Sequence, residues 1–191
     1  MDIIDMKKMT QFNHLNLFSM GYRDRKGKEK SWIFASRCDE PCALNGKDPV
    51  PDAVVVVPFH WEKQRLVLIR EFRVPLGGDQ YGFPAGLVDK NEAVLGAAAR
   101  ELKEETGLTL VRTLRQSPPV YSSSGMTDES VSMVYAECQG EPSTDGNEDS
   151  EEIEVLMLSQ KEARVLLETP GVKFDVKTWI VLSMFAELGR I

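Results

Sequence analysis

The pattern of apolar and polar positions predicts mainly strands in the first half of the chain. Two β-like runs, HLNLFSMGYR at 14–23 and KSWIFASR at 30–37, flank the polar turn DRKGKEK, and this arrangement predicts a hairpin. Two apolar runs rich in β-branched residues, AVVVVPF at 53–59 and RLVLIREF at 65–72, predict buried strands. The segment PLGGDQYGFPAG at 75–86 is rich in Gly and Pro and predicts a loop.

Helical periodicity follows in the second half. Residues 92–106 predict a helix that ends at Gly107 in the C′ position. Because a helix advances 100° per residue, four residues share one stripe, which we assign to the core: Leu95, Ala99, Leu102 and Thr106. The pattern also predicts a turn and then a strand within 120–138, a strand at 153–158, and helices at 159–168 and 175–189. A strand-rich body with few, late helices predicts an α+β fold or an α/β/α sandwich.

Composition and charge narrow the function classes. The chain has 191 residues, and 42% of them are hydrophobic, which is enough for a core. No apolar run approaches the roughly 18 residues that cross a bilayer. The N-terminus does not resemble a signal peptide, so we expect a cytoplasmic protein with no membrane partner. The net charge of −7 argues against a nucleic-acid polymer as partner. Cys38 and Cys42 lack the second ligand pair of a zinc site.

The segment ARELKEETG at 99–107 places three carboxylates close together. Glu101, Glu104 and Glu105 fall within roughly 100° of one another, on the side away from the predicted core stripe. Like charges at such spacings destabilise a helix by about 0.2–0.5 kcal/mol per pair, and Arg100 can offset part of this by reaching Glu104. A solvated helix face is the common explanation of such a cluster. A divalent cation with oxygen ligands is the alternative, because it would remove the repulsion.

A longer motif surrounds these carboxylates. The segment GLVDKNEAVLGAAARELKEETGL at 86–108 reads Gly, five residues, Glu, seven residues, then Arg-Glu-apolar-any-Glu-Glu-any-Gly-apolar. Every fixed position of the Nudix signature is filled, so the chain resembles a Nudix hydrolase. The resemblance implies a Nudix-type α/β/α sandwich with a mixed sheet, and a small N-terminal antiparallel β segment. It also implies cleavage of a nucleoside diphosphate linked to another group, with Mg²⁺ or Mn²⁺ as cofactor.

The same resemblance implies roles for individual residues. Glu101, Glu105 and the backbone carbonyl of Ala85 are the implied metal ligands. Glu104 shares the cluster as a catalytic candidate, and Arg100 orients the carboxylates. Glu92 is implied to be structural. A base must also take a proton from the nucleophile, and carboxylates are the available candidates.

Further segments resemble the ADP-ribose pyrophosphatase branch of the family. These are SWIFASR at 31–37, LIREFRVPLGG at 68–78, FPAGLVD at 83–89 and EEIEV at 151–155. The branch implies a nucleoside diphosphate sugar as substrate, with Trp32 stacked on its base and Arg37 and Arg73 on its phosphates. A dimer or core anchor is the alternative role for Trp32, and Arg70 is a weaker phosphate candidate. Glu151 is the implied loop carboxylate in catalysis, with Glu148 or Asp149 beside it and Glu129 as second choice.

The branch also implies a homodimer. In it, residues 1–48 form an N-terminal β segment that exchanges between subunits, and residues 49–191 form the hydrolase domain. The polar segment DEPCALNGKDPVPD at 39–52 fits a linker between the two.

Two departures weaken the case for ADP-ribose specifically. SSSGMT at 122–127 replaces the branch's Pro-Gly turn, and Gly82 stands where a Glu often precedes the Phe-Pro-Ala-Gly block. Hydrolysis of GDP-mannose or another nucleotide sugar is therefore the alternative activity. A non-catalytic ADP-ribose sensor is the alternative class. The complete carboxylate set argues against a sensor, because a pure binder does not need it.

Overall fold

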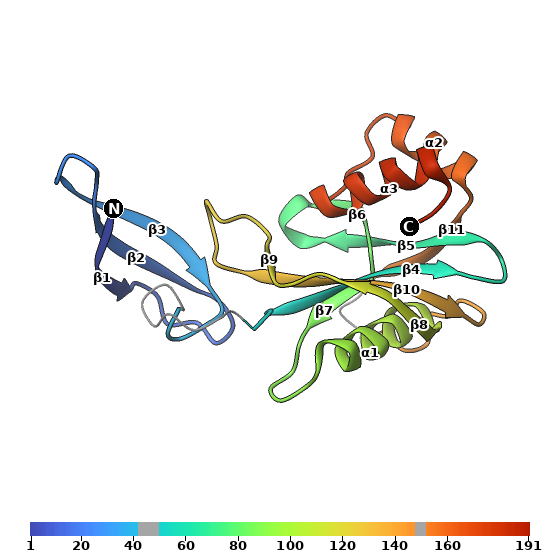
Figure 1. Ribbon diagram of the computed structural model, residues 1–191, viewed down its shortest axis with the longest axis horizontal. Helices are drawn as coiled ribbons and strands as arrows, with labels where there is room; N and C mark the ends of the chain where they lie inside the picture. Colours follow the sequence, from blue (N-terminus) through green and yellow to red (C-terminus); the bar gives the residue numbers. More distant parts are fainter. Residues whose placement is uncertain (42–49, 148–151) are drawn as a thin grey trace. The chain divides into compact units, whose positions relative to one another are not determined.

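The computed structural model describes residues 1–41, 50–147 and 152–191 (Figure 1). The chain divides into two compact units. Unit 1 comprises Met1–Asp52 and Pro119–Val131, and unit 2 comprises Ala53–Pro118 and Ser132–Ile191. Most of the expected linker, residues 42–49, lies outside the described residues. No helix in the described parts of the chain is long and apolar enough to cross a membrane.

Unit 1 is built on a three-stranded antiparallel sheet. Its strands are β1 (Asp2–Lys8), β2 (Asn16–Arg23) and β3 (Glu29–Ser36), in the order β1-β2-β3. The predicted hairpin is confirmed as β2 and β3. Asp24 closes its turn by accepting hydrogen bonds from the backbone N–H groups of Lys26 and Lys28. The sequence pattern did not predict β1, which is almost entirely exposed and therefore carries little apolar alternation.

The larger sheet has the path β11-β5-β4-β10-β8, with β6 on β5, β7 on β4 and β9 on β10. Its strands are β4 (Ala53–His60), β5 (Arg65–Arg73), β6 (Gly78–Gly82), β7 (Ala85–Leu87), β8 (Thr109–Gln116), β9 (Val120–Tyr121), β10 (Ser130–Gln139) and β11 (Ile153–Leu158). The predicted strands at 53–59, 65–72 and 153–158 are confirmed. The segment predicted as a loop at 75–86 contains β6 and the start of β7, joined to β5 by the short 3-10 turn η2 (Val74–Leu76).

Helices lie on both faces of this sheet (Figure 1). Helix α1 (Val94–Thr106) covers one face, and α2 (Gln160–Glu168) and α3 (Val176–Leu188) cover the other. Gly107 ends α1 with φ 72°, as its predicted C′ position requires. Under α1 the core joins residues of the helix and of the sheet, among them Ala98, Leu102, Val56 and Val134. These layers confirm the α+β class and the α/β/α sandwich with its additional small antiparallel sheet.

The buried stripe of α1 differs from the predicted one. Leu102 and Thr106 are buried as expected, but Leu95 is 43% exposed and Ala99 is also exposed. The buried face consists of Ala97, Ala98, Glu101, Leu102, Glu105 and Thr106. The prediction for Leu95 and Ala99 is wrong because the helix turns the face of Ala97 and Ala98 toward the sheet instead. Two of the three glutamates therefore lie on the buried side rather than opposite it.

Candidate functional site

A polar cavity lies beside α1 and β7 in unit 2. Its volume is about 690 Å³. It is lined by Ala85, Gly86, Leu87, Asp89, Arg100, Glu101, Glu104, Glu105 and Gly146. The structure thus brings the three expected metal ligands together with Glu104 and Arg100. The motif placed these residues close in sequence, and the pairing of β7 with β4 places Ala85 and Gly86 beside the helix.

Two carboxylates of this cavity are buried, which requires compensating partners. Glu101 is 8% exposed and Glu105 is 5% exposed. Arg100 Nη1 donates to Glu101 Oε1 at 2.6 Å, and the backbone N–H of Ala85 donates to Glu105 Oε2 at 3.1 Å. A Cβ atom at position 86 would overlap the Glu101 carboxylate, so only glycine lets β7 approach this closely. Strand β7 therefore packs directly against the Glu101 carboxylate of α1.

Arg100 connects the acidic groups of the motif. Its guanidinium donates to Glu92, Glu101 and Glu104, and Nη2 also donates to the carbonyl of Leu87 at 2.9 Å. The hydrogen bond to Glu92 is the main reason that the pKa of Arg100 is raised. The same bond lowers the pKa of Glu92. Arg100 therefore remains charged and fixes the positions of Glu101 and Glu104 in the cavity and of Glu92 beside it.

The oxygen atoms that line the cavity are suitable ligands for a hard divalent cation. Carboxylate and carbonyl oxygens are the ligands that Mg²⁺ prefers. Within residues 1–41, 50–147 and 152–191, no three Asp, Glu, His or Cys side chains converge as a metal cluster. Glu101 and Glu104 point to Arg100 instead. A cation would therefore compete with the guanidinium for these oxygens.

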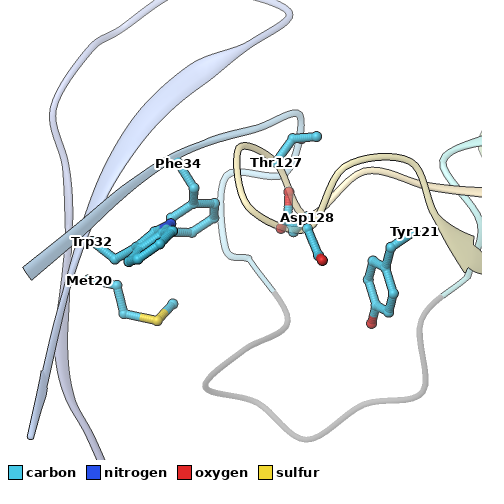
Figure 2. A pocket seen from close by; sticks show the side chains of 7 residues that line it. Met20, Trp32, Phe34, Tyr121, Thr127 and Asp128 are labelled. Carbon is cyan, nitrogen blue, oxygen red and sulfur yellow. The ribbon is translucent and has the colours of Figure 1, made fainter. Parts of the chain in front are cut away.

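A second, mainly apolar pocket lies in unit 1 (Figure 2). Its volume is about 220 Å³, and its lining residues are Met20, Trp32, Phe34, Tyr121, Ser124, Thr127 and Asp128. Trp32 is 51% exposed, and its indole N–H donates to the carbonyl of Gly125 at 3.2 Å. Half of the Trp32 side chain therefore remains open to a ligand or partner, so Trp32 is not a core anchor within this chain.

The predicted arginines are engaged in ion pairs outside these two cavities. Arg37 Nε pairs with Glu129 at 3.0 Å, and Arg73 Nη2 pairs with Glu71 at 2.9 Å. Arg70 pairs with Glu154 at 2.7 Å and lines a separate polar cavity with Lys173. Neither Arg37 nor Arg73 lines the carboxylate cavity or the aromatic pocket.

Some site residues were outside the sequence prediction or outside the described structure. Glu151, together with Glu148 and Asp149, lies outside the described residues. Asp89 and Gly146 line the carboxylate cavity, and Tyr121 and Asp128 line the aromatic pocket. Asp89 ends the segment FPAGLVD at 83–89 and could have been proposed as a site residue. Tyr121 ends the short strand β9, and Gly146 and Asp128 lie between strands, so no local pattern indicated them.

Comparison with known proteins places the chain in a family. Residues 49–179 match the family model described as NUDIX domain. The chain is 28% identical over 180 residues to an ADP-ribose pyrophosphatase of Saccharomyces cerevisiae, covering 90% of this chain and 77% of the yeast protein. It is 34% identical over 130 residues to an ADP-ribose pyrophosphatase of Bacillus subtilis, covering 67% of this chain and 68% of that protein. A crystal structure of an ADP compounds hydrolase has the same fold, with a TM-score of 0.72 at 22% identity, covering 100% of this chain and 96% of that one. The chain belongs to the Nudix hydrolase family.

Proposed function

We propose that this chain hydrolyses the pyrophosphate of a nucleoside diphosphate sugar with a divalent cation, and that ADP-ribose is its main substrate. The products would be AMP and ribose 5-phosphate. The observation that carries this proposal is the buried pair Glu101 and Glu105 beside Gly86 in an open polar cavity. Buried carboxylates are costly unless they are paired or bind a metal. The relatives whose names include ADP-ribose pyrophosphatase support the choice of substrate.

Glu101, Glu105 and the backbone carbonyl of Ala85 would hold the cation, Mg²⁺ or Mn²⁺. When bound, the ion neutralises the negative charge that otherwise repels a nucleophile from the phosphates. Arg100 would orient Glu101 and Glu104 through the hydrogen bonds that it already donates to them.

Hydrolysis also requires a base. Water forms a bond to one phosphorus, the bond from that phosphorus to the bridging oxygen breaks, and a carboxylate takes the proton from water. Glu104 is a candidate because its side chain is 49% exposed at the cavity. Glu151, which precedes β11 in the sequence, is the second candidate.

Substrate binding would involve one aromatic and two basic side chains. Trp32 would stack on the base, a contact that contributes about 1–3 kcal/mol in comparable aromatic–base pairs. Arg37 and Arg73 would bind phosphate oxygens, and each would exchange its present carboxylate partner for the phosphate. The proposal includes a homodimer in which residues 1–48 exchange between subunits to complete each site.

The test is a product assay over ADP-ribose, GDP-mannose, dinucleotides and nucleoside triphosphates, with Mg²⁺ and with a chelator. We expect AMP from ADP-ribose, fastest of the set, and no turnover with the chelator. If the protein hydrolysed GDP-mannose faster than ADP-ribose, GDP-mannose would become the proposed main substrate. Tight binding of ADP-ribose without any turnover would favour the sensor and refute the enzymatic proposal.

A further inference from the structure

The aromatic pocket of unit 1 contains one charged side chain among its lining residues, Asp128. In Figure 2, Trp32 and Tyr121 lie on opposite sides of the pocket, and Asp128 lies between them. The pocket volume of about 220 Å³ is smaller than the roughly 300–1,000 Å³ of sites that enclose a whole drug-sized ligand. The pocket therefore suits one part of a substrate, such as a planar base.

Asp128 is held in place by the end of β3. Ser36 Oγ donates to Asp128 Oδ2 at 3.0 Å, and Ser36 itself is fully buried. The backbone N–H of Ala35 donates to the carbonyl of Met126 at 2.8 Å, which fixes the loop that carries Asp128. A carboxylate accepts about four hydrogen bonds, so Ser36 uses only part of this capacity. Asp128 is thus a fixed acceptor at the edge of an aromatic pocket.

We propose that Asp128 accepts a hydrogen bond from the exocyclic amino group of the substrate's base, and so selects an amino-bearing purine over one with a carbonyl there. This inference rests on the proposed function, in which Trp32 stacks on the base. Stacking alone does not discriminate, because every base has a π-face. An acceptor at the ring edge supplies the discrimination, since adenine presents a donor and hypoxanthine presents an acceptor at position 6.

A carbonyl at this position would face the carboxylate with no proton between the two oxygens. Both groups would then lose hydrogen bonds to water without replacing them, which is the costly case for buried polar groups. Asp128 is partly buried, which strengthens this effect. Burial also raises the pKa of its carboxyl group, against the hydrogen bond from Ser36, which lowers it. Asp128 is therefore a specificity-determining residue that would contact the substrate directly.

The test compares ADP-ribose with IDP-ribose, in which a carbonyl replaces the 6-amino group and N1 carries a proton. In the full-length protein with Mg²⁺, we expect kcat/KM to favour ADP-ribose by about tenfold or more, the range of a hydrogen bond to a charged group. Asp128→Asn should bring this ratio close to one, because an amide can donate to a carbonyl as well as accept from an amine. Equilibrium binding of AMP and IMP without metal should show the same loss of preference.

Asp39→Asn is the matched control, because Asp39 is in the same unit and pairs only with Lys8 among the described contacts, far in sequence from the pocket loop. It should leave the ratio unchanged. Ser36→Ala keeps the charge of Asp128 but removes the hydroxyl that holds its carboxylate in place. This variant should therefore partly reduce the preference for ADP-ribose over IDP-ribose. If Asp128→Asn does not fold, the wild-type ratio and Ser36→Ala still decide the question.

Equal turnover of ADP-ribose and IDP-ribose by the wild type would overturn the inference and leave the proposed function intact. So would an equal loss on both substrates in Asp128→Asn, because that result assigns Asp128 only a structural role in its loop. Absence of turnover with every nucleotide sugar would instead refute the proposed function. In that case, AMP and IMP binding would still test the role of Asp128 by itself.

Discussion

Replacing Gly86 by alanine tests the close packing on which the carboxylate site depends. Gly86 does not have a positive φ, so alanine meets no backbone strain there. Its methyl group would overlap the carboxyl carbon and both oxygens of Glu101. Glu101 must then leave its place beside Arg100, or β7 must move away from α1. Either change disturbs the proposed metal site without removing any of its side chains.

Opposing effects determine the expected loss of stability. Alanine reduces the entropy of the unfolded chain and so stabilises by about 0.4–1 kcal/mol. Overpacking of a close contact destabilises by about 1–3 kcal/mol. We therefore expect a net loss of about 1–2 kcal/mol. For a chain of this size, that loss lowers Tm by about 2–8 °C. A misplaced catalytic group can reduce a rate about 10²-fold. We therefore expect Gly86→Ala to reduce kcat more strongly than it reduces stability.

Gly96→Ala is the matched control. A Cβ there would lie 3.6 Å from Glu92 Cγ, an ordinary contact, and position 96 is inside α1. Alanine in a helix interior is more stable than glycine by about 0.5–1 kcal/mol, so Tm should rise while activity is kept. Thermal unfolding, a Mn²⁺-binding titration and ADP-ribose turnover would be measured on both variants. If Gly86→Ala matched Gly96→Ala in all three, close packing of Glu101 would not explain the glycine.

Three further predictions follow from the two sites. Glu105→Gln should lower turnover by orders of magnitude with the fold intact by circular dichroism, and near-normal activity would refute its assignment as a metal ligand. Trp32→Ala should mainly raise KM for ADP-ribose, and an unchanged KM would place Trp32 outside the base site. The pKa of Glu92 is lowered by its hydrogen bond to Arg100, so its stabilising effect is complete above the ordinary pKa of a Glu and is lost as pH falls through the lowered value. Urea unfolding should therefore show a smaller loss of stability between pH 7 and pH 3 in Glu92→Gln than in the wild type.

The sequence predicted the elements that depend on neighbouring residues alone. The turn of the β2–β3 hairpin is closed by Asp24 and has Gly27 at φ 79°, and α1 ends at Gly107 because glycine adopts the left-handed conformation there. The strands β6 and β7 were missed because they contain glycines and depend on pairing with β5 and β4. Strand pairing of this kind joins residues that no local window includes.

The carboxylate site also combines features that the sequence predicts with features that it does not. The 86–108 motif identified Glu101, Glu104, Glu105 and Arg100 together, since their spacing on one helix is a local property. It did not show that Glu101 and Glu105 are buried. Helical periodicity assigns charged residues to solvent, whereas here the guanidinium of Arg100 and the N–H of Ala85 compensate their burial. The N–H of Ala85 comes into place only when β7 pairs with β4.

The amino-acid sequence alone determined the β2–β3 hairpin, the end of α1 and the identity of the acidic cluster, because these follow from residue spacing and backbone preference. Only the tertiary structure decided which face of α1 is buried, which carboxylate each donor meets, and that Asp128 and Tyr121 join Trp32 around one pocket. The physical reason is that burial and hydrogen bonding between distant segments depend on how the strands pair, and sequence spacing does not encode that pairing.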